Sequence, residues 1–462
     1  MKIARVLALT CLLLPGCARS DGESGEPATG EDPTGETDTG GGTETGEALD
    51  APTYYGDVLP LFAQYCQTCH SPGEIGPFPI ADYDAAVEWG PAIEAAVAAR
   101  TMPPITINNS GICNTFRDTP WLTDEEIALV SDWVAAGMPE GDPSAPRPEP
   151  PTLDELIGED IQEIHTPADF VPEPKGTPGK MFDDYRCFPI ELGSDAERFL
   201  TGFEVLPGNA SIVHHVVGFK VDPERELTGG ITNGAIMSLL DNKDEKPGWE
   251  CFGAAGENVL IDGVPITWAP GGGALNFPGG TGVRFKPGEV VVLQVHYNLL
   301  SGDGSDQTTV RLSWADSVAR ESFMTINDEF LATAFGNPKQ LEPGKESVVF
   351  SWNAPLYEFF GSGNGDLEVM GVFPHMHEYG RRMQVNYKIS GQDDDLCGAY
   401  IDRWDFNWQR SYFYEDPIVL RPADRVEVLC EWDTTGVSKP IGPGFGTGDE
   451  MCLIGLYVAA VE

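Results

Sequence analysis

Beyond Pro151 the sequence consists of short segments rich in Val, Ile, Phe and Tyr, which Pro, Gly, Asn and Asp interrupt about every ten residues. This spacing is typical of antiparallel β-sandwiches, in which strands are short and turns recur regularly. The 54 Gly and 38 Pro residues in the chain of 462 residues supply many turns. Residues 211–217 and 291–298 combine apolar side chains with histidines and are expected to be core strands. The long remainder that begins near Thr152 is therefore predicted to fold into β-sandwiches.

The chain is strongly acidic. It carries 73 Asp and Glu residues against 28 Lys and Arg residues, a formal net charge of -45. A surface this anionic repels phosphate backbones and anionic lipid headgroups. The charge therefore argues against nucleic acid as a partner.

Residues 1–17 have the features of an export signal. Lys2 and Arg5 precede an apolar run, residues 6–14, that is too short to cross a bilayer as a helix. Cys17 ends the segment and resembles the lipidated cysteine of a bacterial lipobox, with an ordinary signal peptide cut nearby as the alternative. The sequence predicts an exported lipoprotein of a Gram-negative bacterium, periplasmic or on the outer membrane or cell surface. Its contact with the membrane is expected through the lipid anchor alone, and disulfides are permitted there.

Two linkers bracket a compact module at residues 51–138. Residues 18–50 contain Gly, Glu, Thr, Asp and Pro with almost nothing apolar, so they are expected to form a solvated acidic tether. Residues 139–160 begin with a Pro-rich stretch, which is expected to act as a stiff, extended spacer.

The module carries the motif Cys66-Gln67-Thr68-Cys69-His70. Two thiols at this spacing can each add to a vinyl group of haem while the adjacent imidazole ligates the iron, so C-x-x-C-H indicates c-type haem attachment. A redox C-x-x-C or half of a zinc site is the alternative, but no second C-x-x-C completes a zinc set. The motif predicts one haem c that is bound covalently by Cys66 and Cys69, with His70 as an axial ligand.

Met102 is the candidate for the second axial ligand, because it follows a predicted helix at 82–100 and carries a thioether. The alternative is a methionine that only fills the core. A capping box that begins at Thr123 predicts a further helix, which ends at Gly137. With its haem motif, Pro-Phe element and distal Met-Pro-Pro, the stretch 57–142 resembles c-type cytochrome modules that occur attached to enzymes. The resemblance implies a small all-α cytochrome c-like domain.

The histidines of the remainder form three groups: the adjoining pair His214 and His215, His296 in another predicted strand, and the H-x-H of His375 and His377. Side chains two positions apart leave the same face of a strand, so His375 and His377 can share one ion. Successive residues point to opposite faces, so His214 and His215 can share an ion only if the strand is bulged or they use different ring nitrogens. The alternative for that pair is one satisfied core histidine and one exposed histidine.

The donor set favours copper. Neutral imidazoles suit copper, zinc and iron, and the Irving–Williams order favours copper among them. Met451 adds a soft donor that favours Cu(I) over zinc. A methionine taken alone is more often a core side chain, and only the Glu-Met-Cys context favours the ligand. An H-x-H also occurs in cupin-type sandwiches, but there a later histidine completes the site, and none follows His377.

The order of these motifs resembles the copper type II ascorbate-dependent monooxygenases, which include the peptidylglycine α-hydroxylating and dopamine β-hydroxylating enzymes. His-His is followed by His-Tyr-Asn, His-x-His and Glu-Met-Cys. The resemblance implies two jelly-roll-like β-sandwich domains at 161–317 and 318–462 that hold two copper ions. It implies an electron-transfer copper held by His214, His215 and His296. It implies an oxygen-binding copper held by His375, His377 and Met451.

The implied activity is hydroxylation of an activated C–H bond of a small organic substrate with O2, which requires two electrons per turnover. An external reductant, ascorbate or a redox protein, is expected to supply them, and the fused c-type haem to pass them on. The alternative function is an exported electron-transfer or copper-binding protein without monooxygenase activity. Met451 favours the enzyme, because a mere electron carrier needs no open copper site with a soft, weak ligand.

The expected substrate is a small molecule that is neutral or aromatic. In the peptide-amidating branch of the family, an Arg before the H-x-H and an Asn and a Tyr after the Met bind the peptide carboxylate. Phe373, Leu453 and Gly455 stand at those positions here. Phe373, Met376 and Leu453 are instead expected to lie near an apolar pocket.

The cysteines predict three disulfides. The ten cysteines include one inside the signal, one at the lipid site and two at the haem, which leaves six. An even remainder in an exported protein suggests pairs, whose connectivity the spacing leaves open. The family resemblance implies two of the pairs and leaves the third: Cys430–Cys452, Cys187–Cys251 and Cys113–Cys397. One histidine, His165, is unassigned and expected at the surface.

Overall fold

The computed structural model describes residues 51–80, 82–148, 155–167, 170–174, 182–227, 229–251, 255–270, 272–360, 365–444 and 449–461. The predicted export signal, the lipid site at Cys17 and the acidic linker at 18–50 lie outside the described residues. Among the helices of the described ranges, none is both long enough and apolar enough to cross a membrane.

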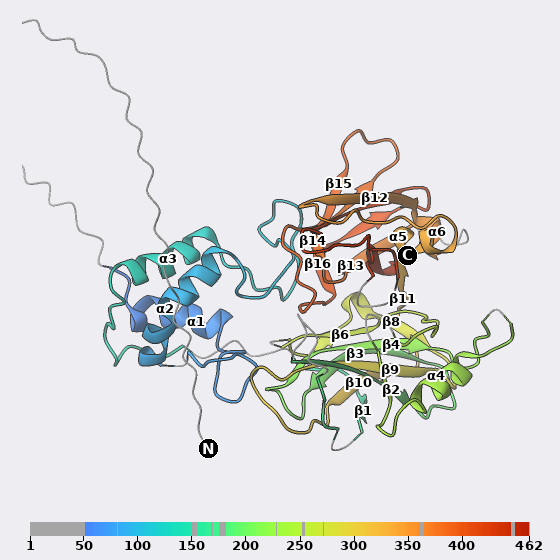
Figure 1. Cartoon of the computed structure of the whole chain (residues 1–462), viewed down its shortest axis with the longest axis horizontal. Helices are drawn as coiled ribbons and strands as arrows, with labels where there is room; N and C mark the ends of the chain where they lie inside the picture. The colour runs from blue at the N-terminus through green and yellow to red at the C-terminus, as the bar shows by residue number, and fades with distance from the viewer. Residues whose placement is uncertain are drawn as a thin grey trace, which may run out of the picture. The chain divides into compact units, whose positions relative to one another are not determined.

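A small helical module opens the described chain (Figure 1). It contains a π-helical turn at Tyr54–Val58, α1 at Leu59–Tyr65, α2 at Tyr83–Ala98 and α3 at Asp124–Ala135. These helices bury one apolar cluster, to which Tyr54, Phe62 and Trp133 contribute large side chains. The backbone N–H of Tyr54 donates to the carbonyl of Pro139 at 2.8 Å, so the module closes where the Pro-rich spacer begins.

Side-chain caps start the two longer helices. Asp82 accepts a hydrogen bond from the backbone of Ala85 at the start of α2, and Thr123 forms the predicted capping box with Glu126 at the start of α3. After α3 the chain turns at Gly137, whose φ of 83° suits glycine better than other residues. The structure therefore confirms both predicted helices.

The rest of the chain is built mainly from β-strands (Figure 1). The first half contains β1 (Asp160–His165), β2 (Asp183–Glu191), β3 (Arg198–Leu206), β4 (Val213–Val221), α4 (Asn233–Asp241), β5 (Trp249–Glu250), β6 (Ile266–Trp268), β7 (Leu275–Asn276), β8 (Thr281–Phe285), β9 (Val290–Asn298) and β10 (Thr309–Ala315). The second half contains β11 (Arg320–Asn327), α5 (Glu329–Ala332), β12 (Val348–Pro355), α6 (Leu356–Phe360), β13 (Leu367–His375), β14 (Gly380–Lys388), β15 (Leu396–Ile401), β16 (Tyr412–Leu420), β17 (Arg425–Trp432) and β18 (Leu453–Ala460).

Within the described residues these strands form three sheets. The largest has nine strands, in the order β1-β10-β3-β8-β11-β18-β13-β16 with β7 paired to β3. A five-stranded sheet, β5-β2-β9-β4-β6, belongs to the first half, and a four-stranded sheet, β12-β17-β14-β15, belongs to the second. Each smaller sheet shares an apolar core with its part of the large sheet, so the architecture is that of the predicted β-sandwiches.

The two halves are joined within one sheet. Strand β8 of the first half runs parallel to β11, and β11 pairs antiparallel with β18 of the second half. The predicted domain boundary between residues 317 and 318 lies in the connection between β10 and β11. That boundary therefore separates strands of a single sheet, because backbone hydrogen bonds continue across it.

One segment of the helical part, residues 105–118, packs on the second half. Ile107 and Phe116 are buried in the core of that half, where they form bridges with Ile401 and Tyr414. The predicted module at 51–138 therefore does not bury all of its apolar side chains by itself. Ile107 and Phe116 are buried against the β-sandwich of the second half instead.

The described residues contain three disulfides, the number that the cysteine count predicts. Their pairs are Cys113–Cys397, Cys187–Cys251 and Cys430–Cys452. The first ties segment 105–118 to β15, the second ties β2 to the chain after β5, and the third ties β17 to the residue before β18. Each native disulfide of this kind typically stabilises a fold by about 2–5 kcal/mol.

Candidate metal centres

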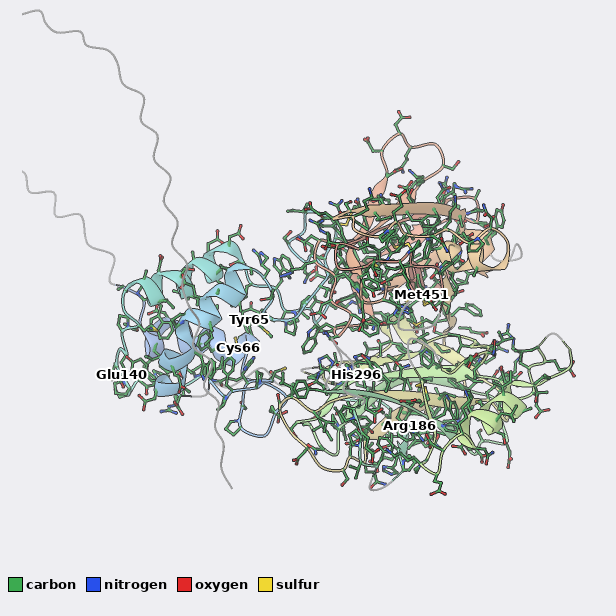
Figure 2. All side chains as sticks on the ribbon, in the orientation of Figure 1. Tyr65, Cys66, Glu140, Arg186, His296 and Met451 are labelled. Atoms are coloured by element: carbon green, nitrogen blue, oxygen red, sulfur yellow. A yellow bond between two sulfur atoms is a disulfide. The ribbon has the colours of Figure 1, made fainter. Side chains whose placement is uncertain are left out.

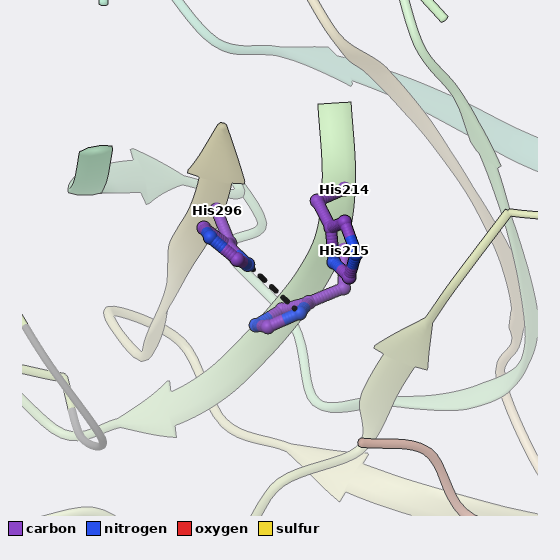
Figure 3. A group of neighbouring side chains, drawn as sticks. All are labelled: His214, His215 and His296. Atoms are coloured by element: carbon purple, nitrogen blue, oxygen red, sulfur yellow. Dashed lines mark hydrogen bonds between the residues drawn. The ribbon is translucent and has the colours of Figure 1, made fainter. Parts of the chain in front are cut away.

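The first group of histidines lies on two neighbouring strands of the five-stranded sheet. His214 and His215 lie on β4, and His296 lies opposite them on β9 (Figure 3). The register shifts between Val213, which faces Tyr297, and His215, which faces His296. This register shift is a β-bulge, which is one of the two conditions under which adjoining histidines can share an ion. It turns the rings of His214 and His215 toward His296.

The three rings form a compact donor set, called here the three-histidine site. One nitrogen from each of His214, His215 and His296 lies within 4.8 Å of the others, and all three side chains are buried. Bonds of about 2 Å from imidazole nitrogens to one ion place those nitrogens about 3–4 Å apart, so small ring rotations would complete the set.

Asp183 orients His296. The Nε2–H of His296 donates to Oδ1 of Asp183 at 2.9 Å, and the side-chain amide of Asn298 donates to the same oxygen at 2.8 Å. The ring of Tyr185 stacks on the ring of His296 with centroids 4.1 Å apart. Because Nε2 is engaged, Nδ1 of His296 is the nitrogen with the lone pair, and it lies 3.3 Å from Nδ1 of His215. A carboxylate that fixes the tautomer of a ligating histidine is typical of metal sites.

Burial keeps the imidazoles of His214 and His215 neutral. Desolvation holds the pKa of His214 well below its ordinary value and lowers the pKa of His215 to about 4. Within the part of the chain that the structure describes, Nδ1 of His214 is buried without a hydrogen-bond partner. Burying a nitrogen lone pair without a partner costs free energy, and a bound cation would remove that cost. The neutral imidazoles of this site therefore fit a copper ion.

The second group lies where β13 ends. His375 is the last residue of the strand, and His377 lies in the turn toward β14. The prediction that both histidines leave one face of a strand is therefore wrong for His377, because the strand stops two residues earlier. The two rings still lie side by side, with centroids 5.2 Å apart.

Hydrogen bonds set the orientation of both rings. Nδ1 of His375 donates to Oε1 of Gln409 at 2.5 Å, and Nδ1 of His377 donates to the carbonyl of Asp449 at 3.0 Å. The nitrogen left for a metal is Nε2 in each ring, whereas His296 offers Nδ1. Burial lowers the pKa of His375 to about 3, and its Nε2 has no hydrogen-bond partner among the described residues.

Met451 and His375 line the same cavity of about 360 Å³. Met451 is buried in the chain just before β18 (Figure 2), and Phe373 and Leu453 also line the cavity. Met376 does not, because it is buried in the core of the second half. His375, His377 and Met451 are called here the His-His-Met site.

Glu450 joins the two chain segments of the His-His-Met site. Its buried carboxylate accepts hydrogen bonds from the backbone N–H of His377 at 2.9 Å and of Tyr379 at 2.7 Å, and from Nε1 of Trp432 at 2.8 Å. Burial raises the pKa of Glu450 to about 7 in spite of these donors. Sequence reasoning assigned no role to Glu450 itself, although its place before Met451 in the Glu-Met-Cys motif was the available signal.

Replacing Glu450 with alanine is expected to weaken the His-His-Met site. Buried donors left without an acceptor cost about 1–3 kcal/mol each, so the free energy of unfolding should fall by several kcal/mol. Loss of a residue that positions ligands typically lowers metal affinity about 10–100-fold. Denaturant unfolding and copper titration against a competing chelator measure both effects. Glu427→Ala, which removes a surface partner of Lys388, is the control; equal copper affinity in the two variants would contradict a positioning role.

One loop contacts both sites. Residues 402–411 connect β15 to β16, and the carbonyl of Asn407 accepts from Nδ1 of His215 at 3.2 Å. Gln409 holds His375, as described above, and the ring of Phe406 lies 6.3–6.4 Å from the rings of Tyr185 and His375. Sequence reasoning missed this loop, because amides and aromatic residues are common and carry no metal-ligand signature.

The haem motif lies after α1. Cys66 and Cys69 form no disulfide with each other or with another described cysteine. Nδ1 of His70 donates to the carbonyl of Phe78 at 2.9 Å, which leaves Nε2 for an iron, and Phe78 stacks on Trp89 with centroids 4.1 Å apart. These residues fit a covalently bound haem.

A cavity of about 420 Å³ lies beside the motif, and Cys69 and Thr68 line it together with Pro103 and Pro104. Met102 lines a separate cavity of about 10 Å³ next to it. Met102 therefore precedes Pro103, which lines both cavities, but does not itself line the cavity beside Cys69.

His165 contributes to neither histidine group. It ends β1, its side chain is exposed, and Nδ1 lies 2.9 Å from the hydroxyl of Thr309.

Comparison with known proteins identifies relatives of part of the chain. Residues 362–459 match the copper type II ascorbate-dependent monooxygenase C-terminal domain. DBH-like monooxygenase protein 1 of Gallus gallus is 26% identical over 256 residues, which cover 52% of this chain and 41% of that protein. The putative DBH-like monooxygenase protein 2 of Homo sapiens is 26% identical over 259 residues, covering 54% and 47%. Tyramine beta-hydroxylase of Caenorhabditis briggsae is 22% identical over 258 residues, covering 55% and 40%.

The chain spans less than half the length of each of these relatives. The matched residues 362–459 include β13, β18 and the whole His-His-Met site. These matches support the resemblance that the order of the motifs implied. The second half of the chain is thus similar to the C-terminal domain of the copper type II ascorbate-dependent monooxygenases.

Proposed function

We propose that this chain is a copper-dependent monooxygenase that hydroxylates an activated C–H bond of a small organic substrate with O2. The observation that carries the proposal is that His375 and Met451 of the His-His-Met site line an apolar cavity, and that one loop contacts both this site and the three-histidine site. An electron-transfer or copper-binding protein without oxygenase activity has no use for such a cavity. The similarity of residues 362–459 to a monooxygenase domain adds independent support.

Two copper ions would supply one electron each and activate O2 when they are bound. One oxygen atom then enters the substrate, and the other leaves as water with two protons. His214, His215 and His296 would hold a copper that supplies electron storage. His375, His377 and Met451 would hold a copper that supplies reactivity toward O2. The protein positions the metal ligands and provides an apolar cavity that excludes water. Asp183, Gln409 and Glu450 orient the ligands by hydrogen bonds.

The cavity beside Met451 favours a neutral or aromatic substrate. Its volume of about 360 Å³ lies within the range of small-molecule sites. Phe219, Val264, Phe373 and Leu453 are among the apolar side chains that line it, and no Lys or Arg does so among the described residues. A carboxylate would therefore find no cationic partner, so a peptide with a free C-terminus is a poor candidate.

The electrons for this reaction enter through the c-type haem on Cys66 and Cys69, with His70 as one axial ligand and Met102 as the candidate for the other. A donor fused to its acceptor acts at an effective concentration of about millimolar. An external reductant, ascorbate or a redox protein, restores the haem. The chain is exported and anchored by a lipid on Cys17 in the envelope of a Gram-negative bacterium, where haem attachment and disulfides are both possible.

Metal analysis and product analysis of the purified chain test the proposed function. We expect two copper ions and one haem per chain, and O2-dependent hydroxylation of small benzylic substrates. A glycine-extended peptide of similar reactivity should give no product, because the cavity offers its carboxylate no partner. Zinc in both sites would refute the copper assignment, efficient peptide hydroxylation would refute the substrate class, and tight copper binding without any hydroxylated product would favour the electron-transfer alternative.

A further inference from the structure

The loop at 402–411 has an aromatic residue that the proposed reaction does not use. Trp408 lies between the residues that contact the two sites, and its ring lies beside the ring of His214, with centroids 4.7 Å apart. His214 belongs to the three-histidine site. Trp408 therefore contacts a candidate ligand of the copper that would store an electron.

Hydrogen bonds on both sides hold Trp408 in this position. Asn407 accepts from His215 before it, and Gln409 accepts from His375 after it. Farther along, the backbone N–H of Ser411 donates to the hydroxyl of Thr267 on β6 at 2.9 Å. The loop around Trp408 is thus fixed to the first half of the chain as well as to the second.

Trp408 also lines the cavity of about 420 Å³ beside the haem motif. Tyr65, Thr68 and Cys69 line the same cavity from the helical module. The side chain therefore reaches from the wall of the cavity beside Cys69 to the ring of His214.

The helical module is tied to the half of the chain that carries Trp408. The disulfide Cys113–Cys397 links segment 105–118 to β15, which directly precedes the loop. Arg403 in the loop donates from Nη1 to the carbonyl of Ala99 at 2.5 Å. The backbone N–H of Asn108 donates to the carbonyl of Tyr400 at 2.8 Å. These contacts keep the haem motif facing the same cavity wall.

We infer that Trp408 is the bridging residue through which an electron passes from the haem module to the three-histidine site. The inference rests on the proposed function, because it requires a haem on Cys66 and Cys69 and a copper at His214. In the step one electron leaves Fe(II) and reduces Cu(II), which gives Fe(III) and Cu(I), and Trp408 neither gains nor loses an electron overall. An external one-electron reductant returns the haem to Fe(II). A role of Trp408 as a simple cover for His214 would leave the rate of this transfer unchanged.

The test measures electron transfer within the full-length protein loaded with haem and Cu(II). A photoexcited reductant delivers one electron to the haem without O2, and the haem absorbance and the Cu(II) paramagnetic resonance signal are then followed. Trp408→Leu should transfer the electron at least about tenfold more slowly than the wild type, with unchanged metal contents and an unchanged Cu(II) spectrum. Trp408→Phe, which keeps a ring beside His214, should fall between them. Phe413→Leu is the matched control, because Phe413 lines the same cavity and approaches no histidine of the site in the described structure.

The outcomes separate this inference from the proposed function. Transfer in the wild type and slow transfer in Trp408→Leu support both. Transfer at equal rates in the wild type and in Trp408→Leu overturns the role of Trp408 alone. A wild-type protein that holds both metals and passes no electron between them overturns the proposed role of the haem, and the inference falls with it.

Discussion

Met451→Leu should abolish O2-dependent product formation while the chain keeps its fold and the copper at its three-histidine site. Leucine preserves most of the buried volume at residue 451, so packing around the cavity changes little. The thioether sulfur, the soft donor of the His-His-Met site, is lost. Residues that only orient a metal ligand typically contribute about 10–100-fold, so loss of a ligand should cost at least about 100-fold in turnover.

Three measurements on Met451→Leu separate a lost ligand from a lost fold. Product formation should disappear, copper content should fall toward one ion per chain, and the thermal unfolding midpoint should stay near that of the wild type. Met383→Leu is the control, since Met383 is equally buried in the core of the second half but lines no described cavity. Wild-type rates of oxygen consumption and product formation in Met451→Leu would show that Met451 is a core side chain and no ligand.

The candidate metal ligands could be proposed from the sequence because their chemistry is local and their residue types are scarce. With seven histidines in the chain, the adjoining pair, the lone strand histidine and the H-x-H could be considered one by one. The capping box before α3 was equally visible, because Thr123 and Glu126 are three positions apart and satisfy each other's backbone. Such signals depend on a few neighbouring residues, so they can be recognised without knowledge of the fold.

The features that the sequence did not reveal depend on distant contacts between ordinary residues. Nothing in β8 or β11 states that the two strands pair in parallel and unite both halves in one sheet. The burial of Ile107 and Phe116 against the second half could not be predicted either, because an apolar side chain does not specify which core it joins. After β13 ends at His375, the chain is held by Glu450, which accepts from the backbone N–H of His377 and lies 73 positions beyond that residue.

The bulge in β4 answers a question that the sequence left open, namely whether His214 and His215 can face one ion. Alternation along a regular strand turns two adjoining histidines to opposite faces, so His214 and His215 could share one ion only if the strand were bulged or if they used different ring nitrogens. The register shift between Val213 and His215 is such a bulge. Bulges are retained next to functional sites because they re-aim side chains, and here the bulge brings two buried imidazoles to His296.

His296→Ala should remove copper from the three-histidine site and stop sustained turnover, while the His-His-Met site keeps its metal. The variant removes one of three ligands and also leaves Asp183 with Asn298 as the remaining one of its two described side-chain donors. The remaining imidazoles of His214 and His215 cannot complete a closed set, so copper affinity should fall by more than the about 10–100-fold that is typical for an orienting residue. Asp183→Asn, which keeps the shape of the side chain but weakens its hold on Nε2, should show the smaller effect.

His165→Ala is the matched control for this experiment, because His165 is an exposed histidine outside both sites. Copper content, the Cu(II) resonance spectrum and product yield are measured on the three variants and the wild type. In His296→Ala we expect one copper per chain with the spectrum of the His-His-Met site, and less than one product per chain when the chain is reduced beforehand, because the remaining copper stores only one of the two electrons that a turnover needs. Two coppers per chain and sustained turnover in His296→Ala would mean that the three buried rings are a packed histidine cluster and hold no electron-storing metal.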